Sequence, residues 1–176
     1  MRDVTDSGAD PAAGSPLVAE AIRKAAVAWV AVDGGPQLAL WCLPLDDALY
    51  VVTGPGEQNA PGLAASGTAE VTVRGDHGGR IVTWPAEVTR LAPEGERWAT
   101  VAPQLAAKRL NASGSPAELA QRWAASGCAI NRLAPAGPPS AAGRTLPDSS
   151  LAAPPRETPA VRRAARPFRL HRVRRR

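Results

Sequence analysis

The chain has 176 residues, of which 44% are hydrophobic and five are tryptophan. This length and composition suit one packed domain with appendages and leave little room for two. Its 16 glycines and 18 prolines lie well above the average share of roughly 12% for these two residue types. The sequence is therefore rich in turns and contains segments that do not pack.

The charge is unevenly distributed. Residues 1–135 hold 11 basic and 14 acidic side chains, a net of −3, whereas residues 136–176 hold 10 arginines against 2 acids, a net of +8. The high pI of 10.2 therefore belongs to the tail and does not mark the folded body as a nucleic-acid binder. Proline-rich, arginine-rich sequence without apolar periodicity predicts a disordered tail over 136–176, capable of weak, non-specific, salt-sensitive contact with polyanions.

The N-terminus and the apolar runs give no targeting or membrane signal. Residues 1–14 are small and polar, with three acids before residue 11, which predicts a flexible N-terminus and not a secretory signal. The longest apolar run, 25–32, is far shorter than the ~20 residues that span a bilayer. Cys42 and Cys128 lie in apolar surroundings without metal or redox spacing, so reduced thiols are expected. We expect a cytoplasmic protein with no membrane segment.

The first half of the chain predicts one helix and a meander of strands. Ser15 followed by Pro16 opens a helix that runs to about residue 26. Strands are predicted over 27–32, 37–43 and 48–53, separated by hairpin turns at 33–36 and 44–47. The first two strands are apolar on both faces. They therefore need cover on both sides, from the barrel interior on one and from a helix or a second subunit on the other.

The second half predicts two long strands, two helices and a closing strand. A loop at 54–57 leads into a short helix to about residue 66, and strands follow over 68–74 and 80–91, with Pro85 marking an edge or a bulge. Helices are predicted over 94–110 and, from the capping box of Ser115 and Glu118, up to Gly127. A last strand covers 128–133. This order predicts an α+β domain over residues 15–135 built on an antiparallel barrel.

The usual catalytic motifs are missing. His77 and His171 have no Cys, Asp or Glu at ligand spacing, so no metal site is predicted. Neither a nucleophile elbow nor a P-loop is present, and Gly54-Pro55-Gly56 begins a dinucleotide fingerprint that Asn59 breaks. This pattern is consistent with an enzyme whose bound cofactor carries out the chemistry.

The candidate binding residues fall into three groups, each with an ordinary structural alternative. The loop of Thr53, Gly54, Gly56 and Gln58 either cradles a phosphate with backbone N–H groups or is a plain strand-to-helix turn. Arg74 and Arg80 are candidates for a cofactor phosphate and ring edge. Arg80 shares the strand parity of the apolar Val82 and Trp84, and its alternative is a strand-end arginine that reaches water.

Two further cationic groups are weighed in the same way. Lys108, followed by Arg109, either contacts a ligand or complements the dipole at a helix C-terminus. His77 lies in a glycine-rich turn, where a solvent-exposed imidazole is the simpler interpretation. The tryptophans indicate core and subunit packing, although Trp41 and Trp84 are also suited to flank a flat ring.

The order and spacing of four segments resemble one known family. Leu40-Trp41, residues 49–53 (Leu-Tyr-Val-Val-Thr), Leu63 and residues 71–74 (Val-Thr-Val-Arg) follow each other as in the pyridoxamine 5′-phosphate oxidase-like FMN-binding split barrels. These include actinobacterial branches that use FMN or the deazaflavin F420. The resemblance covers roughly residues 27–135. It implies a six-stranded antiparallel split β-barrel with flanking helices, a homodimer, and a flavin-type cofactor bound between subunits.

The resemblance also implies a function and shows one departure. It implies an FMN- or F420-dependent oxidoreductase that moves hydride to or from a small organic molecule. Such families usually carry a lysine after the third strand that helps to hold the cofactor phosphate, whereas residues 57–63 here hold no cation and include Glu57. Two alternatives therefore stay open: a cofactor-free split barrel that acts as a binding or scaffold protein, and a nucleic-acid-associated protein that acts through its arginine-rich tail.

Overall fold

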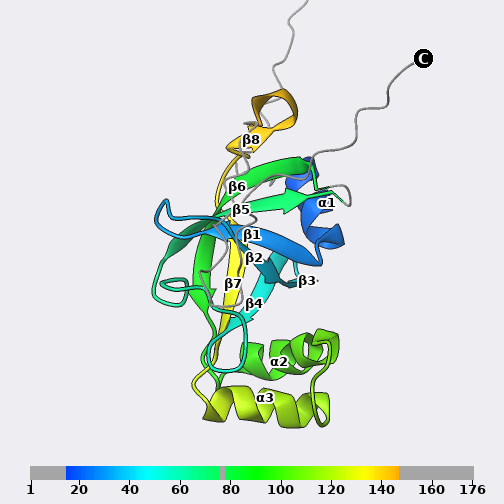
Figure 1. The fold of residues 1–176 in the computed structure, drawn as a ribbon, viewed down its shortest axis with the longest axis vertical. Coiled ribbons are helices and arrows are strands. Elements are labelled where there is room, and N and C mark those ends of the chain that lie inside the picture. Colours follow the sequence, from blue (N-terminus) through cyan, green and yellow to red (C-terminus); the bar gives the residue numbers. More distant parts are fainter. Residues whose placement is uncertain (1–14, 76–77, 147–176) are drawn as a thin grey trace, which may run out of the picture.

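The computed structural model describes residues 15–75 and 78–146 (Figure 1). The chain begins with helix α1 (Pro16–Lys24), which has proline in its first turn and gives way to extended backbone at Ala25. The strands are β1 (Val27–Ala31), β2 (Leu38–Trp41), β3 (Leu43–Leu45), β4 (Ala48–Thr53), β5 (Thr68–Arg74), β6 (Arg80–Arg90), β7 (Ala129–Pro135) and β8 (Ala141–Ala142). Between β6 and β7 lie α2 (Glu96–Lys108) and α3 (Pro116–Ala125).

The strands form one antiparallel sheet that curls into a nearly closed barrel. Its order is β2-β1-β5-β6-β7-β4-β3, with β8 paired to β6. The two end strands of this path, β2 and β3, are consecutive in the chain and are separated only by Cys42. The predicted strand over 37–43 is thus bent at Cys42: its first part pairs with β1, and its continuation pairs with β4. Counted as one bent strand, it makes the predicted six-stranded barrel, to which β8 is added.

The barrel interior holds the first of two hydrophobic cores. It is filled by inward-facing residues of the sheet, including Val30, Val51, Val71, Trp84 and Leu133, all fully buried. Helix α1 contributes Val18, Ala21 and Ile22 to the same core. Ala69, Val71 and Val73 face the core as predicted for β5, while Thr68 and Glu70 are exposed on the other side; Thr72 on that side is fully buried and hydrogen-bonded to Gln37 and Thr83.

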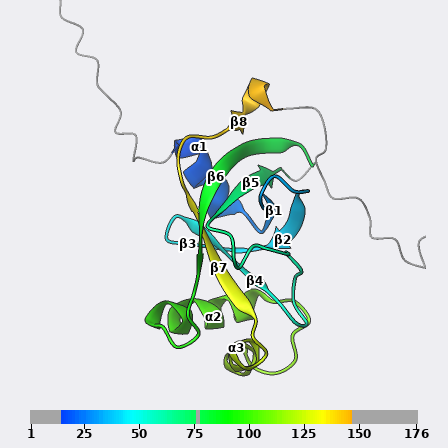
Figure 2. The same cartoon turned by 90° about the vertical axis from the view of Figure 1, so that its left-hand side faces the viewer.

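The second core lies on the outer side of β4 and β7. Every residue of β4 is buried: Leu49 and Val51 face the barrel interior, while Ala48, Tyr50 and Val52 face outward. Helices α2 and α3 pack over that outward side and bury Trp98, Val101, Leu105, Leu119 and Trp123 against it. Figures 1 and 2 show the two helices side by side at one end of the barrel. The capping box of Ser115 and Glu118 forms as predicted and sets the start of α3.

Three predicted elements differ from the structure. The predicted hairpin turn at 44–47 is wrong in its first half, because Pro44 and Leu45 belong to β3 and only Asp46 and Asp47 turn, both with positive φ. The predicted short helix before Ser66 is also wrong: residues 61–65 form turns, since Pro61 and Gly62 suit turns better than a helix. Beyond Pro135 the folded part continues through β8 and a 3₁₀ turn (Gly143–Thr145), so the tail does not begin at residue 136. Residues 147–176 lie outside the described residues.

Pro85 lies within a continuous β6 and not at an interruption. The carbonyl of Pro85 accepts a hydrogen bond from the Ala136 N–H, while β7 pairs with β6 only from Ala86 onward and β8 only at Val82 and Thr83. Within a strand, a residue's nitrogen and carbonyl face the same neighbour. The missing N–H of Pro85 therefore falls where the chain leaves the sheet between β7 and β8, so no ladder bond is lost.

None of the helices in the described part of the chain is long and apolar enough to cross a membrane.

The packing of α2 predicts that substitutions at two leucines differ in their effect on the free energy of unfolding. Leu105 is fully buried in the second core, whereas Leu110, just beyond the helix, is 78% exposed. Replacing Leu105 by Ala should lower the free energy of unfolding by about 2–5 kcal/mol, because it leaves a cavity under β4. Leu110→Ala is the control and should change it by less than about 0.5 kcal/mol. Urea denaturation followed by circular dichroism measures both, and equal effects would contradict the second core.

Candidate functional site

The loop that follows β4 is held by its own backbone. The Gly54 N–H donates to the Gln58 carbonyl (3.1 Å) and the Glu57 N–H donates to the Gly54 carbonyl (3.0 Å), while Pro55 has no N–H. A Cβ on Gly54 would lie 2.9 Å from the Cα of Cys128, and Gly54 also has φ +134°. Gly54 is therefore required by close packing on the start of β7 and by its backbone conformation. The backbone N–H groups of Gly54 and Glu57 therefore form hydrogen bonds within the turn and do not point at a phosphate.

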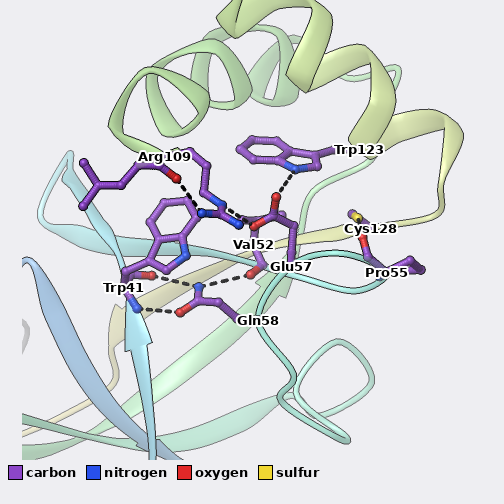
Figure 3. A network of polar contacts seen from close by, with 9 residues as sticks. Trp41, Val52, Pro55, Glu57, Gln58, Arg109, Trp123 and Cys128 are labelled. Atoms are coloured by element: carbon purple, nitrogen blue, oxygen red, sulfur yellow. Dashed lines mark hydrogen bonds and ion pairs between the residues drawn. The ribbon is translucent and has the colours of Figure 1, made fainter. Parts of the chain in front are cut away.

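Gln58 closes the barrel. Its side-chain oxygen accepts a hydrogen bond from the Trp41 N–H (2.6 Å), and its side-chain nitrogen donates to the carbonyls of Trp41 (3.1 Å) and Val52 (3.2 Å) (Figure 3). The amide thus pairs with both backbone groups of Trp41 as a neighbouring strand would. Because all of these side-chain bonds join β2 to β4, the role that the structure gives Gln58 is structural.

Glu57 points away from the sheet, toward α2 and α3. Its side chain is only 6% exposed, and its two carboxylate oxygens accept hydrogen bonds from Arg109 Nε (2.8 Å) and Trp123 Nε1 (3.0 Å) (Figure 3). A buried carboxylate needs such compensation. The acid that breaks the family pattern is therefore neutralised by Arg109 and tied to both helices, so its charge is not directed at a ligand beside Gln58.

The two cysteines have raised pKa values. Burial raises the pKa of the Cys42 thiol to about 12. Burial, followed by the negative charge of Glu57, raises the pKa of Cys128, whose Sγ lies 3.5 Å from the Pro55 carbonyl. Both side chains are free thiols in the described structure and stay protonated near neutral pH. Neither is suited to act as a nucleophile.

The remaining predicted residues of this region have different surroundings. Thr53 is buried and its hydroxyl oxygen accepts a hydrogen bond from Asn131 (3.3 Å), whose side chain is fully buried. Gly56 is exposed in the loop with φ +75°. Lys108 is exposed in the last turn of α2, and it is its neighbour Arg109, the C-cap residue, that reaches the loop. The predicted Lys108 dipole role therefore stays compatible with the structure.

A larger groove runs along the outer face of the sheet beside α1. It has a volume of about 490 Å³, and it is lined by the exposed apolar side chains Leu17, Val27 and Ile81 together with Trp29, Lys24 and Arg74. The guanidinium of Arg74 lies over the Trp29 ring, 4.8 Å from its centroid. The groove thus combines an apolar wall, a half-buried aromatic ring and cationic groups.

Arg74 lines this groove, whereas Arg80, its neighbour across the sheet, is not part of the lining. They are cross-strand partners of β5 and β6, and a register shift between Val73 and Arg74 makes Val82 the partner of Val73. This irregularity means that the parity shared by Arg80 and Val82 does not set the direction of Arg80. Like charges directly opposite each other on neighbouring strands repel. An anion bound between the two arginines would reduce this repulsion.

The predicted site residues thus form two groups. Thr53, Gly54, Gly56 and Gln58 belong to the loop beside α2 and α3, while Arg74 and Arg80 belong to the strand pair beside the groove. The pocket beside the loop and the groove share no lining residue. His77 lies outside the described residues. Among those that are described, no cluster of three His, Cys, Asp or Glu side chains is placed to hold a metal ion.

Sequence reasoning missed Trp29 as a groove residue and Arg109 with Trp123 as partners of Glu57. The alternation of Val27, Trp29 and Ala31 placed Trp29 on one strand face, but not beside α1. No local signal joins residues 57, 109 and 123, because they are more than fifty positions apart or lie on separate helices.

The closing role of Gln58 gives a test. Gln58→Ala removes three hydrogen bonds and leaves the Trp41 backbone unpaired, so it should lower the free energy of unfolding by about 2–4 kcal/mol. Gln104→Ala is the matched control: Gln104 is exposed on α2 with one local hydrogen bond to Thr100, and its loss should cost less than about 0.5 kcal/mol. Thermal unfolding compares them. A Gln58→Ala protein as stable as the control would show that the barrel closes without this amide.

The comparisons with known proteins concern the fold. No protein-family model matches the chain, and a search of curated proteins finds no match. Among solved structures, HutZ, described as the heme storage protein of Vibrio cholerae, aligns with 14% identity and a TM-score of 0.50, over 69% of this chain and 89% of that chain. A Listeria innocua protein described as a candidate pyridoxamine 5′-phosphate oxidase aligns with 12% identity and a TM-score of 0.44, over 66% and 88%.

Identities this low bear on the fold and not on the activity. The barrel described above and its match to HutZ confirm the architecture that the sequence resemblance predicted. The chain therefore has an antiparallel split-barrel fold, which it shares with HutZ.

Proposed function

We propose that the protein is a split-barrel oxidoreductase that binds FMN or F420 and transfers hydride to or from a small organic molecule. The observation that carries this proposal is the groove beside α1, where an apolar wall, the Trp29 ring and Arg74 lie together, with Arg80 as the cross-strand partner of Arg74. A flat anionic cofactor needs an aromatic or apolar surface for its ring and cations for its phosphate.

The residues present fit such a group at the groove better than at the loop after β4. In the loop, Gly54 and Glu57 use their N–H groups within the turn, and Gln58 uses its amide to close the barrel. At the groove, Val27 and Ile81 supply apolar surface for a ring beside Trp29, whose own ring lies under the Arg74 guanidinium, and Arg74 with its cross-strand partner Arg80 would supply the cations for phosphate oxygens. The volume of about 490 Å³ lies within the usual range for cofactor sites.

The division of labour follows from these side chains. A bound flavin or deazaflavin supplies the hydride chemistry, for which no side-chain nucleophile or metal cluster stands out in the described residues. Trp29, Val27 and Ile81 would exclude water from the ring, and the two arginines would orient the phosphate. Lys24 is held by Glu20 (2.8 Å), so its charge is partly compensated within α1.

Cofactor titration tests this proposal. The full chain is titrated with FMN and with F420, followed by cofactor fluorescence, and saturable binding of one of them is expected. Arg74→Ala and Arg80→Ala should each weaken it by about 1.5–3 kcal/mol, the value of a charge-assisted hydrogen bond. Arg90→Ala, an exposed arginine at the other end of β6, is the control and should leave binding unchanged.

Two other outcomes would redirect the interpretation. If neither flavin binds at large excess, the cofactor-free binding or scaffold function takes precedence. Because HutZ is described as a heme storage protein, hemin is a third arm of the titration, and hemin binding without flavin binding would contradict the oxidoreductase proposal. Circular dichroism of each variant checks that a lost affinity does not reflect a lost fold.

We also propose that the protein is a homodimer through the groove face. Of the four exposed large hydrophobic side chains in the described part of the chain, Leu17, Val27 and Ile81 line this groove and only Leu110 lies elsewhere. Grouped apolar side chains of this kind mark an interaction surface. A second copy covering them would enclose a cofactor between subunits, as the family resemblance implies.

Light scattering measures the dimer. The full chain should show twice the monomer mass at micromolar concentration, and Val27→Asp should shift it toward monomer, because a carboxylate would be buried in an apolar contact. Leu110→Asp places the same charge at the exposed leucine outside the groove and should leave the mass unchanged. A monomeric parent protein, or equal effects of both variants, would overturn this interface.

A further inference from the structure

A second cleft lies between the loop after β4 and helix α3, and it shares no lining residue with the groove. It has a volume of about 260 Å³. One wall is Pro55, Gly56 and Glu57. The opposite wall is a stripe of α3 and its C-cap made by Leu119, Arg122, Trp123 and Ser126, whose spacing of three and four residues places them on one helix face. The connection between α2 and α3, residues 111–113, closes one end.

Two arginines in this cleft are held in position by the protein. Arg109 donates from Nε to Glu57 (2.8 Å) and from a terminal nitrogen to the Leu110 carbonyl (2.7 Å). Arg122 donates from a terminal nitrogen to the Ser113 carbonyl (2.6 Å). A guanidinium has five N–H donors, so each arginine keeps donors beyond these bonds. Anchoring of this kind reduces the entropy lost when a ligand binds.

The charge balance of the lining favours an anion. Both oxygens of Glu57 are already used by Arg109 and Trp123, and its side chain is 94% buried, so it presents little negative charge to the cleft. Glu118 lies near Arg122 and is not part of the lining; its carboxylate accepts hydrogen bonds from the backbone and hydroxyl of Ser115 and keeps its negative charge. Counting Glu57, Arg109 and Arg122, the lining carries one excess positive charge.

Further polar groups and an apolar patch complete the cleft. The side chains of Asn111, Ser113 and Ser126 line it and make no side-chain hydrogen bond within residues 15–75 and 78–146. Leu119 and the Trp123 ring supply apolar surface, while the Trp123 N–H is directed at Glu57. The cleft thus offers cationic forks, hydroxyl and amide groups, and a small apolar area.

We propose that this cleft binds the oxyanion group, carboxylate or phosphate, of a small molecule, with Arg109 and Arg122 as the recognising cations. The planar guanidinium fork matches both head groups. The small volume restricts the ligand to a compact molecule whose apolar part lies on Leu119 and Trp123. This site is independent of the groove proposed for the cofactor, with which it shares no lining residue.

The indole N–H of Trp123 reports on this cleft. In ¹⁵N–¹H spectra of the full chain, its signal is assigned by its loss in Trp123→Phe. Titration with sodium phosphate and with sodium acetate, against sodium chloride at equal ionic strength, should move the Trp123 signal saturably with at least one of the two. The one that binds more tightly identifies the head group. The signal of Trp84, which is fully buried in the barrel core and outside the cleft, should not move.

Two arginine variants decide the outcome. Arg122→Gln should raise the dissociation constant by at least about tenfold, the effect of losing a charge-assisted hydrogen bond. Arg97→Gln, an exposed arginine on α2 that pairs with Asp46, should not change it. The site is disproved if phosphate and acetate act only as chloride does, or if Arg122→Gln binds as tightly as the parent. Flavin titration of Arg122→Gln should be normal, which separates this site from the groove.

Discussion

The barrel depends on one corner, where the strand that leaves β1 turns to join β4. The strands β2 and β3 are the two ends of the sheet and are separated by Cys42 alone. The chain therefore links the two ends of the sheet through a bend at this one residue. On the side away from β1 the backbone of Trp41 would have no strand partner, and an unpaired buried backbone group is costly. The Gln58 amide supplies the missing partner and links Trp41 to Val52. The loop after β4 is thus part of the closure.

A second consequence follows from the burial of β4 on both faces. Because its inward residues join the barrel core and its outward residues join the α2–α3 core, β4 couples two cores that otherwise have separate members. Glu57 strengthens this coupling, since its carboxylate binds the end of α2 through Arg109 and α3 through Trp123. Removing Arg109 or Trp123 would leave the buried carboxylate of Glu57 short of a partner, which is strongly destabilising, so the loop is tied to both helices.

The polar side chains of the loop after β4 are used within the fold. Glu57 accepts a hydrogen bond from Arg109, Gln58 donates one to the Val52 carbonyl and Thr53 accepts one from Asn131, so all three side chains have partners within the fold. Arg74 and Lys24 line the groove, and Arg109 and Arg122 line the smaller cleft. Glu57 is paired with Arg109 inside the protein, whereas Arg74 and Arg80 lie on a different strand pair.

The sequence by itself determined the local elements: the bounds of β4 and β5, the capping box before α3 and the antiparallel barrel all follow from alternation and capping chemistry, which act between near neighbours. It also indicated Arg74 and Arg80 as candidate residues, and the structure makes them cross-strand partners. Only the tertiary structure decided that β2 bends at Cys42, that Gln58 closes the barrel and that Glu57 meets Arg109. These outcomes depend on residues far apart in the chain, whose contacts are set by sheet closure and helix packing and carry no periodicity that a single sequence displays.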